Sequence, residues 1–347
     1  MSDVSQSPRA PADRRPTLEA VAARAGVGRG TVSRVVNGSP KVSEAAKEAV
    51  LRAIDELGYV PNRAARALVT RRTDSIALVV SESEERIFAE PFFAKIIRGV
   101  TAALADTGLQ LLLTFARSRD ERIRLAQYLT GQHVDGVLLI SLHGDDPLPD
   151  KLEAAGLPTV LGGVPVGLSP VSFVDVDNRG GARRAVEHLL DTGRRTISTL
   201  AGPLDMTAGV YRLEGYRDAL DAAGVKVSEE LVGYGDFSES SGAAAMADLL
   251  DRRGDIDAVF AASDPMALGA MRIIKESGRR IPDDVAVVGF DDSPVGPHTD
   301  PPLSTVHQPV EEMGQRMTRL LLARISGEPI GELSAILPTH LIVRDSS

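Results

Sequence analysis

Apolar residues recur at helical spacing in three short segments near the start of the chain. Thr17 is placed to cap a first helix, and a second helix is predicted from about residue 28 to residue 36. Ser43 can cap a third helix, which runs to about residue 56 and is ended by Gly58. Each predicted helix carries one apolar stripe, so we expect three helices around one small core.

From residue 74 the pattern changes to short apolar runs that alternate with amphipathic helices. This repetition is typical of parallel sheets covered by helices on both faces. The predicted strands are 75–80, 109–115, 136–140, 196–200, 231–235, 258–262 and 285–290. The predicted helices are 91–104, 121–131, 180–192, 210–223, 240–250, 265–276 and 310–325. Because these elements amount to about two doubly wound units, we expect two α/β lobes.

These patterns predict the domain organisation. The first 13 residues are polar, include two prolines and are expected to form a disordered tail. A three-helix head at 14–60 and a linker with a short hinge helix at 61–73 are expected to precede a two-lobed domain at 74–347. The chain is expected to cross to the first lobe at 306–309 and to return at 336–343. The predicted first lobe is therefore about 74–174 and 310–334, and the second is about 175–306 and 335–343.

The first two helices are joined by the tight turn Ala25-Gly26-Val27, which is typical of a helix-turn-helix that lays its second helix in the major groove of DNA. That helix turns its valines inward and leaves Arg29, Gly30, Ser33 and Arg34 outward. A structural hairpin would not need two projecting arginines. The glycines at 26, 28 and 30 resemble a dinucleotide-binding loop, but a helix rather than a strand precedes them, and the third spacing is wrong.

Charge is divided unequally along the chain. Residues 1–72 hold 13 Lys and Arg against 7 Asp and Glu, whereas the remainder holds 26 against 41. A basic head on an acidic body concentrates the attraction for phosphate on the helix-turn-helix. The overall charge of −9 is therefore compatible with DNA binding.

Enzyme chemistry is the rival interpretation. The chain has no cysteine, and its six histidines lack metal-ligand spacing, so we expect no metal site and no cofactor. Neither a Gly-x-Ser-x-Gly elbow nor a phosphate-binding loop occurs. Paired carboxylates at 283–284 and 291–292 leave a sugar-processing enzyme open as a minor alternative. The chain shows no secretory signal and no apolar run long enough to span a membrane, so a cytoplasmic protein is expected.

The runs TLEAVAARAGVGRGTVSRVVNG and GYVPNRAARAL resemble the lactose/galactose-repressor family of bacterial transcription regulators, and the resemblance extends to the C-terminus. Four stretches are also similar to repressors of cellulose and cello-oligosaccharide utilisation: RRPTLEAVAARAGVGRGTVSRV, VTRRTDSIALVVSESEERIFAEPFF, GQHVDGVLLISLH and YGDFSES. The family resemblance implies a periplasmic-binding-protein-like architecture, with a ligand cleft between the lobes.

The resemblance also implies a set of DNA contacts. Arg29 and Arg34 would read bases, since an arginine fork matches the acceptors of guanine. Thr17, Ser33, Asn37 and Tyr59 match phosphate-contacting positions of the family. Residues 62–69 would form the hinge helix and insert Leu68 into the minor groove. The full predicted DNA-binding set is Thr17, Arg29, Gly30, Thr31, Ser33, Arg34, Asn37, Tyr59, Asn62, Ala65 and Leu68.

Ligands of open α/β sheets bind beyond the carboxyl ends of the strands. By resemblance, Arg212 is the family's ligand-binding arginine, Asp291 its hydroxyl-binding carboxylate and Phe237 its stacking aromatic. The full predicted effector set is Phe92, Phe93, Ser141, Arg212, Phe237, Ser263, Asp291 and Gln308. Three alternatives stay open from the residues alone: the phenylalanines belong to the core, Asp291 caps a turn, and Arg212 is a solvated charge.

The sequence therefore predicts a homodimeric repressor of sugar-utilisation genes. It would bind a pseudo-palindromic operator, because one short reading helix contacts too few base pairs to be specific. A cello-oligosaccharide such as cellobiose would release it. Another disaccharide or a purine corepressor is the alternative effector.

Overall fold

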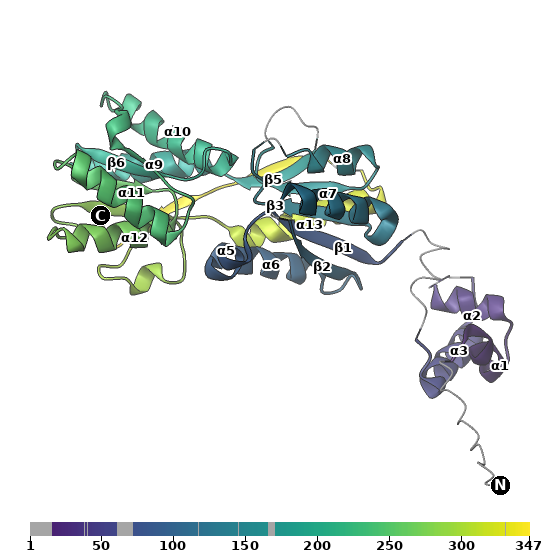
Figure 1. Cartoon of the computed structure of the whole chain (residues 1–347). Helices are drawn as coiled ribbons and strands as arrows, with labels where there is room; N and C mark the ends of the chain where they lie inside the picture. The colour runs from purple at the N-terminus through teal and green to yellow at the C-terminus, as the bar shows by residue number, and fades with distance from the viewer. Residues whose placement is uncertain are drawn as a thin grey trace, which may run out of the picture. The chain divides into compact units, whose positions relative to one another are not determined.

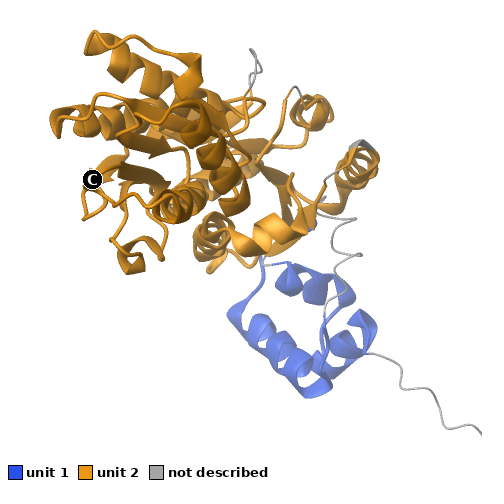
Figure 2. Cartoon of the chain, turned by 60° about the vertical axis from the view of Figure 1, so that its left-hand side comes forward, with its two compact units in different colours: residues 1–73 blue, residues 74–347 orange. Residues whose placement is uncertain are grey.

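The computed structural model describes residues 16–37, 39, 41–60, 72–116, 118–144, 146–165, 171–329 and 331–347. The chain divides into two compact units, residues 1–73 and residues 74–347 (Figure 2). The predicted hinge residues Asn62, Ala65 and Leu68 lie outside the described residues.

The head contains the three predicted helices, α1 (Leu18–Ala25), α2 (Arg29–Val36) and α3 (Glu44–Leu57). Both predicted caps are present, since the side chains of Thr17 and Ser43 accept hydrogen bonds from backbone N–H groups three residues later. Gly26 and Gly58 end α1 and α3 in the left-handed conformation. The small core consists of Val21, Ala22, Val32, Val50, Ala53 and Tyr59.

The second unit contains two six-stranded sheets, one in each lobe (Figure 1). The first-lobe sheet is parallel and has the order β11-β5-β4-β3-β1-β2. Its strands are β1 (Ser75–Val80), β2 (Gln110–Phe115), β3 (Gly136–Ile140), β4 (Thr159–Gly162), β5 (Ser172–Val176) and β11 (Ser334–Leu337).

The second-lobe sheet has the order β12-β10-β9-β8-β6-β7, with β12 antiparallel to β10 and the other pairs parallel. Its strands are β6 (Ile197–Ala201), β7 (Val232–Tyr234), β8 (Ala258–Ala261), β9 (Ala286–Asp291), β10 (Ser304–His307) and β12 (His340–Ile342). The predicted pair of doubly wound lobes is confirmed.

Helices cover both faces of each sheet, because every strand presents alternate apolar residues to opposite sides. In β1, Ile76 and Leu78 join the core under one pair of helices, and Ala77 and Val79 join the core under the other. The first-lobe helices are α6 (Pro91–Leu104) with α13 (Val310–Ser326), and α7 (Arg119–Tyr128) with α8 (Leu148–Ala154). The second-lobe helices are α9 (Asn178–Asp191) with α10 (Thr207–Ala222), and α11 (Glu239–Arg252) with α12 (Asp264–Glu276). Short helical turns complete the fold: α5 (Glu84–Ala89), a π-turn (Leu129–His133) and 3₁₀ turns (Glu229–Leu231, Gly296–His298).

The chain passes from the first-lobe sheet to the second-lobe sheet between Leu337 and His340. The segment 336–343 contributes to two strands in different sheets, β11 and β12, which are separated at Pro338. Residues 335–337 therefore belong to the first lobe, and so does β5 up to Val176. After β10 the chain enters the first lobe, where α13 packs in the core.

No helix in the described part of the chain is long and apolar enough to cross a membrane. The described residues also hold no cluster of three or more His, Asp or Glu side chains that could bind a metal ion.

The seam between α11 and α12 depends on glycine. A Cβ at Gly269 would overlap the carbonyl oxygen of Glu239 and lie 2.6 Å from the backbone nitrogen of Ala243. Gly269→Ala should therefore push the two helices apart and lower the free energy of unfolding by about 1–3 kcal/mol. Gly254→Ala is the matched control, because a Cβ there meets nothing within 4 Å. Urea unfolding with equal midpoints for the two variants would contradict this account of the seam.

Candidate ligand cleft and DNA-reading head

The carboxyl ends of the strands from both lobes meet at a cleft within the second unit. It contains two hollows, and the smaller of them is lined by Arg86, Glu90, Phe237 and Asp291 among others. The hollows adjoin, because they share the lining residues Phe92, Ser141, Met206, Ala208, Arg212 and Gln308.

The structure brings all eight predicted effector residues together, since each of them lines the smaller hollow. They come from the first turn of α6, from the loops after β3, β7 and β8, from the end of β9, from the crossover after β10 and from α10. Three of them, Ser141, Phe237 and Asp291, have backbone φ angles of 55°, 71° and 122°. Residues other than glycine are rarely held in this region, and such strain is concentrated at binding sites.

Arg212 is buried rather than solvated, with 5% of its surface exposed. Its Nε donates to the side-chain oxygen of Asn178 at 2.9 Å, and its Nη1 donates to the carbonyl of Ala262 at 2.6 Å. The ring of Phe290 lies 3.7 Å from the guanidinium carbon. Burial lowers the pKa of Arg212, and the nearby carboxylates, Asp291 first among them, oppose that shift. The guanidinium is therefore a fixed cation at the wall of the cleft.

Asp291 is the principal acid beside this cation. Its Oδ1 accepts a hydrogen bond from Gln308 at 2.5 Å and lies 3.5 Å from Nη1 of Arg212. Burial raises the pKa of Asp291, while the charge of Arg212 lowers it. A second buried acid, Asp264, has a pKa raised to about 8 by burial and by Asp291. Asp291 thus bonds across the cleft wall and not to a local turn.

The aromatic residues divide between the cleft and the core. Phe92 is half-buried and lines both hollows, whereas Phe93 is 1% exposed and belongs to the first-lobe core. Phe237 lies between two cations, with the guanidinium carbons of Arg86 and Arg212 at 5.4 and 5.6 Å from its ring centre. Ser263 holds this loop, because its hydroxyl donates to the carbonyl of Phe237 at 2.9 Å.

The sequence interpretation missed a charged group on the first-lobe side. Arg86 donates from Nε to Glu90 at 2.5 Å and from Nη1 to Glu82 at 2.7 Å, and both Arg86 and Glu90 line the smaller hollow. Burial raises the pKa of Glu90 to about 7 against the opposing charge of Arg86. The three charges lie one helical turn apart, at 82, 86 and 90, and this spacing is the signal that could have revealed them.

On the head, α2 exposes Arg29, Gly30 and Arg34, while Thr31 and Ser33 are half-buried. Arg29 pairs with Glu19 at 3.2 Å, and Asn37 donates to the Ser33 hydroxyl at 3.4 Å. The hydroxyl of Thr17 is engaged as the cap of α1. Tyr59 is 8% exposed and belongs to the head core.

Comparison with known proteins identifies the family. Residues 17–62 match the family described as "Bacterial regulatory proteins, lacI family", and residues 186–347 match a periplasmic binding protein-like domain. The HTH-type transcriptional regulator CelR of Thermobifida fusca is 61% identical over 335 residues, which cover 96% of this chain and 98% of CelR. The chain belongs to the lacI family.

More distant relatives and solved structures agree. The repressor CytR of Escherichia coli K12 is 32% identical over 95% of this chain and 96% of CytR. A CelR–cellobiose complex has a TM-score of 0.78 at 59% identity and covers 96% of this chain and 100% of its own. A Lac repressor dimer bound to operator and the anti-inducer ONPF has a TM-score of 0.84 at 30% identity, with 96% and 99% coverage.

The predicted resemblance is thereby confirmed, and the enzyme alternative is excluded. This lacI-family protein is a DNA-binding transcription regulator that acts in the cytoplasm. The lacI family match covers its head.

Polar contacts hold the two lobes of the regulator around the cleft. His143, after β3, lies with Nε2 at 3.0 Å from Glu82 of its own lobe and Nδ1 at 2.9 Å from Asp205 of the second lobe. Lys95 of α6 donates to the carbonyl of Asp292 in the second lobe at 2.9 Å. Hydrogen bonding to Glu82 and Asp205 raises the pKa of His143 against the effect of burial.

The raised pKa of His143 predicts a pH-dependent contribution to stability. That contribution is present in full below the ordinary histidine pKa and is lost as pH rises through the higher folded-state pKa. The charged groups near His143 are its two acid partners, Glu82 and Asp205, and three residues that line the same hollow as His143. These three residues are Arg122, Asp146 and Lys151. Because the imidazole is 30% exposed, we expect its charge to contribute at most about 1 kcal/mol to the free energy of unfolding.

His143→Gln, which keeps hydrogen-bonding groups but no titratable charge, should lower the melting temperature more at pH 6 than at pH 8.5. Differential scanning calorimetry of parent and variant at both pH values measures this difference, in which the other histidines cancel. Equal differences at the two pH values would show that the charge of His143 is not involved.

Proposed function

We propose that this protein represses sugar-utilisation genes as a homodimer and is released from its operator by a cello-oligosaccharide such as cellobiose. The observation that carries the proposal is the buried pair of Arg212 and Asp291 beside an aromatic ring in the cleft. Guanidinium and carboxylate groups bond sugar hydroxyls in pairs, and an aromatic face stacks on a pyranose ring. The similarity to CelR, solved with cellobiose, supports a sugar of that class.

Release follows from lobe closure in this proposal. Residues 14–60 are the DNA-reading head, and residues 61–73 join it as a hinge to the first lobe of the two-lobed domain. Asn62, Ala65 and Leu68 would contact operator DNA only while the two hinges of a dimer lie together. A sugar that prefers one arrangement of the lobes shifts the population of both subunits toward it, and the hinges separate.

The proposal is tested by fluorescence anisotropy on an operator duplex that the purified protein selects from random sequence. The operator should be a pseudo-palindrome bound by two chains, and cellobiose should lower the affinity. Calorimetry against cello-oligosaccharides, other disaccharides and purines identifies the effector class. Purine binding that strengthens operator binding would establish the corepressor alternative instead.

Arg34 should read the operator sequence. It is exposed on α2, and its side chain forms no hydrogen bond or ion pair with another described residue. Arg34→Ala should weaken operator binding by about 1–3 kcal/mol and binding to random duplex far less. Arg52→Ala, an exposed arginine on α3 paired only with Glu48 among the described residues, is the matched control. Equal losses on both duplexes would reassign Arg34 to the phosphate backbone.

Arg212 should decide effector affinity. Arg212→Ala leaves its buried partners unsatisfied in the complex, so sugar binding should weaken by about 2–5 kcal/mol, or at least about thirtyfold in Kd. Operator binding without sugar should remain. Arg217→Ala is the control, because it lies on the same helix and pairs with Glu229 at the surface. A calorimetric Kd equal to that of the parent would place the sugar elsewhere.

A further inference from the structure

The guanidinium of Arg212 has one nitrogen left for a ligand. Nε donates to Asn178, and Nη1 is shared between Ala262 and Asp291. Nη2 donates to none of the residues that the structure describes, and Arg212 lines both hollows of the cleft. The orientation of the guanidinium plane therefore decides where this remaining donor lies.

Asn178 fixes that plane from the start of α9, and both Asn178 and Asp175 also line the larger hollow. Asn178 follows β5 and is 2% exposed. Its Nδ2 donates to Oδ1 of Asp175 at 3.0 Å and to the carbonyl of Val176 at 3.3 Å. Since both of these neighbours are acceptors, the amide nitrogen must face them and the amide oxygen must face Arg212.

Asp175 is held just as firmly. It is 4% exposed, and its Oδ1 also accepts from the backbone of Val176 at 2.7 Å. Its Oδ2 accepts from the backbone N–H of Val164 at 3.1 Å, in the loop after β4. The carbonyl of Val164 in turn accepts from the hydroxyl of Thr207 at the start of α10.

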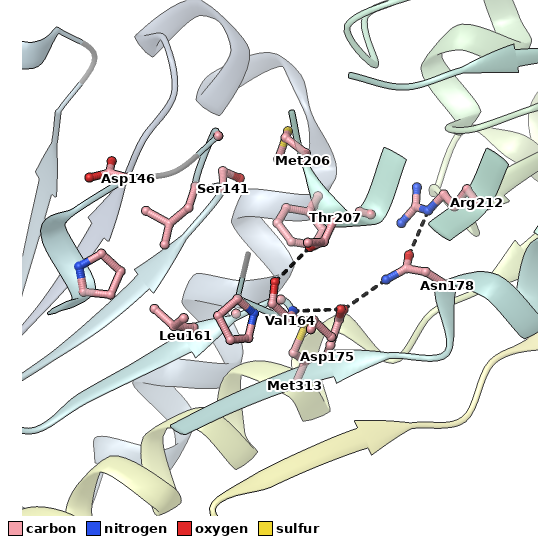
Figure 3. Close-up of a pocket in the computed structure, with 18 of the residues that line it drawn as sticks. Ser141, Asp146, Leu161, Val164, Asp175, Asn178, Met206, Thr207, Arg212 and Met313 are labelled. Atoms are coloured by element: carbon pink, nitrogen blue, oxygen red, sulfur yellow. Dashed lines mark hydrogen bonds between the residues drawn. The ribbon is translucent and has the colours of Figure 1, made fainter. Parts of the chain in front are cut away.

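Figure 3 shows the resulting chain of hydrogen bonds, which runs from Thr207 through Val164, Asp175 and Asn178 to Arg212. Both ends of the chain lie on α10 of the second lobe, and Val164 and Asp175 belong to the first lobe. The ligand-facing arginine is thus attached to the opposite lobe through side chains that are buried and fully oriented.

We propose that Asn178 and Asp175 are positioning residues, which aim Nη2 of Arg212 at the effector and make that aim depend on how the lobes are placed. The inference rests on the proposed function in taking a sugar as the ligand of Arg212. A role in helix capping does not account for Asn178, because Asp177 is the cap of α9 and accepts from Gly180 at 2.9 Å.

A double-mutant cycle tests the proposal with the full-length protein and cellobiose. Asn178→Ala should raise the Kd for cellobiose by about ten- to a hundredfold, as expected for losing a hydrogen bond to a charged group. In the Arg212→Ala background the same change should alter the Kd by less than about twofold, because there is nothing left to position. Operator affinity without sugar should be unchanged.

Two further variants separate positioning from folding. Asp177→Ala removes the adjacent helix cap and should lower the melting temperature while leaving the Kd for cellobiose unchanged. Asp175→Asn replaces one carboxylate oxygen with an NH2 group, which cannot accept the hydrogen bond that Asn178 or Val164 donates there. The orientation of Asn178 is then lost, so cellobiose binding should weaken, but only when Arg212 is present. Asp175→Asn also serves as the second probe if Asn178→Ala does not fold.

The outcomes are distinguishable. An Asn178→Ala effect of equal size with and without Arg212, or no effect with Arg212 present, overturns the positioning role and leaves the proposed site intact. An Arg212→Ala variant that binds cellobiose like the parent overturns the proposed site itself, and the positioning role with it.

Discussion

A guanidinium carried into a protein interior keeps its charge, so every surrounding group must compensate for the lost water. Arg212 meets this requirement with the amide of Asn178, the carbonyl of Ala262 and the carboxylate of Asp291. These partners come from the start of α9 and from the ends of β8 and β9. The architecture of the second lobe at the cleft is therefore organised around one cation.

The same requirement explains the unusual acids nearby. Asp291 and Asp264 are both buried, and their mutual repulsion adds to burial in raising the pKa of Asp264. Arg212 lies closest to Asp291 and therefore compensates mainly for the charge of that acid. Asp264 instead accepts hydrogen bonds from the hydroxyl of Thr305 and the backbone N–H of Ser293. Fixed polar groups with their bonding capacity nearly filled discriminate among ligands, because a poorly matched ligand leaves some of them unpaired.

The contacts between the lobes differ in kind from those within them. Each of the four apolar clusters of the second unit lies within one lobe. Hydrogen bonds and charges from His143, Lys95 and Thr207 join one lobe to the other. Since each lobe keeps its own core, the lobes can move as rigid bodies about the connections after β5, after β10 and between β11 and β12. The polar contacts between the lobes can be exchanged at a small cost in free energy during such a movement.

The sequence alone determined the elements whose signals are local. The helices capped by Thr17 and Ser43 follow from hydrogen bonds over three residues, and the strand 75–80 follows from a run of apolar residues. The cleft residues were found because strands of a parallel sheet end at one edge and because the family resemblance extends over the chain. Short strands such as β4 and β5 were missed, since strands of four or five residues that are only partly apolar carry too little pattern.

Only the tertiary structure decided which polar groups meet. Asp175, Asn178 and Arg212 are separated by up to 37 positions, and no spacing in the sequence announces that their side chains form one chain of hydrogen bonds. The burial of Tyr59 and the role of Pro338 in dividing two strands between two sheets were likewise decided by packing. Local propensity depends on near neighbours, whereas the identity of a buried partner depends on where the whole chain brings distant segments together.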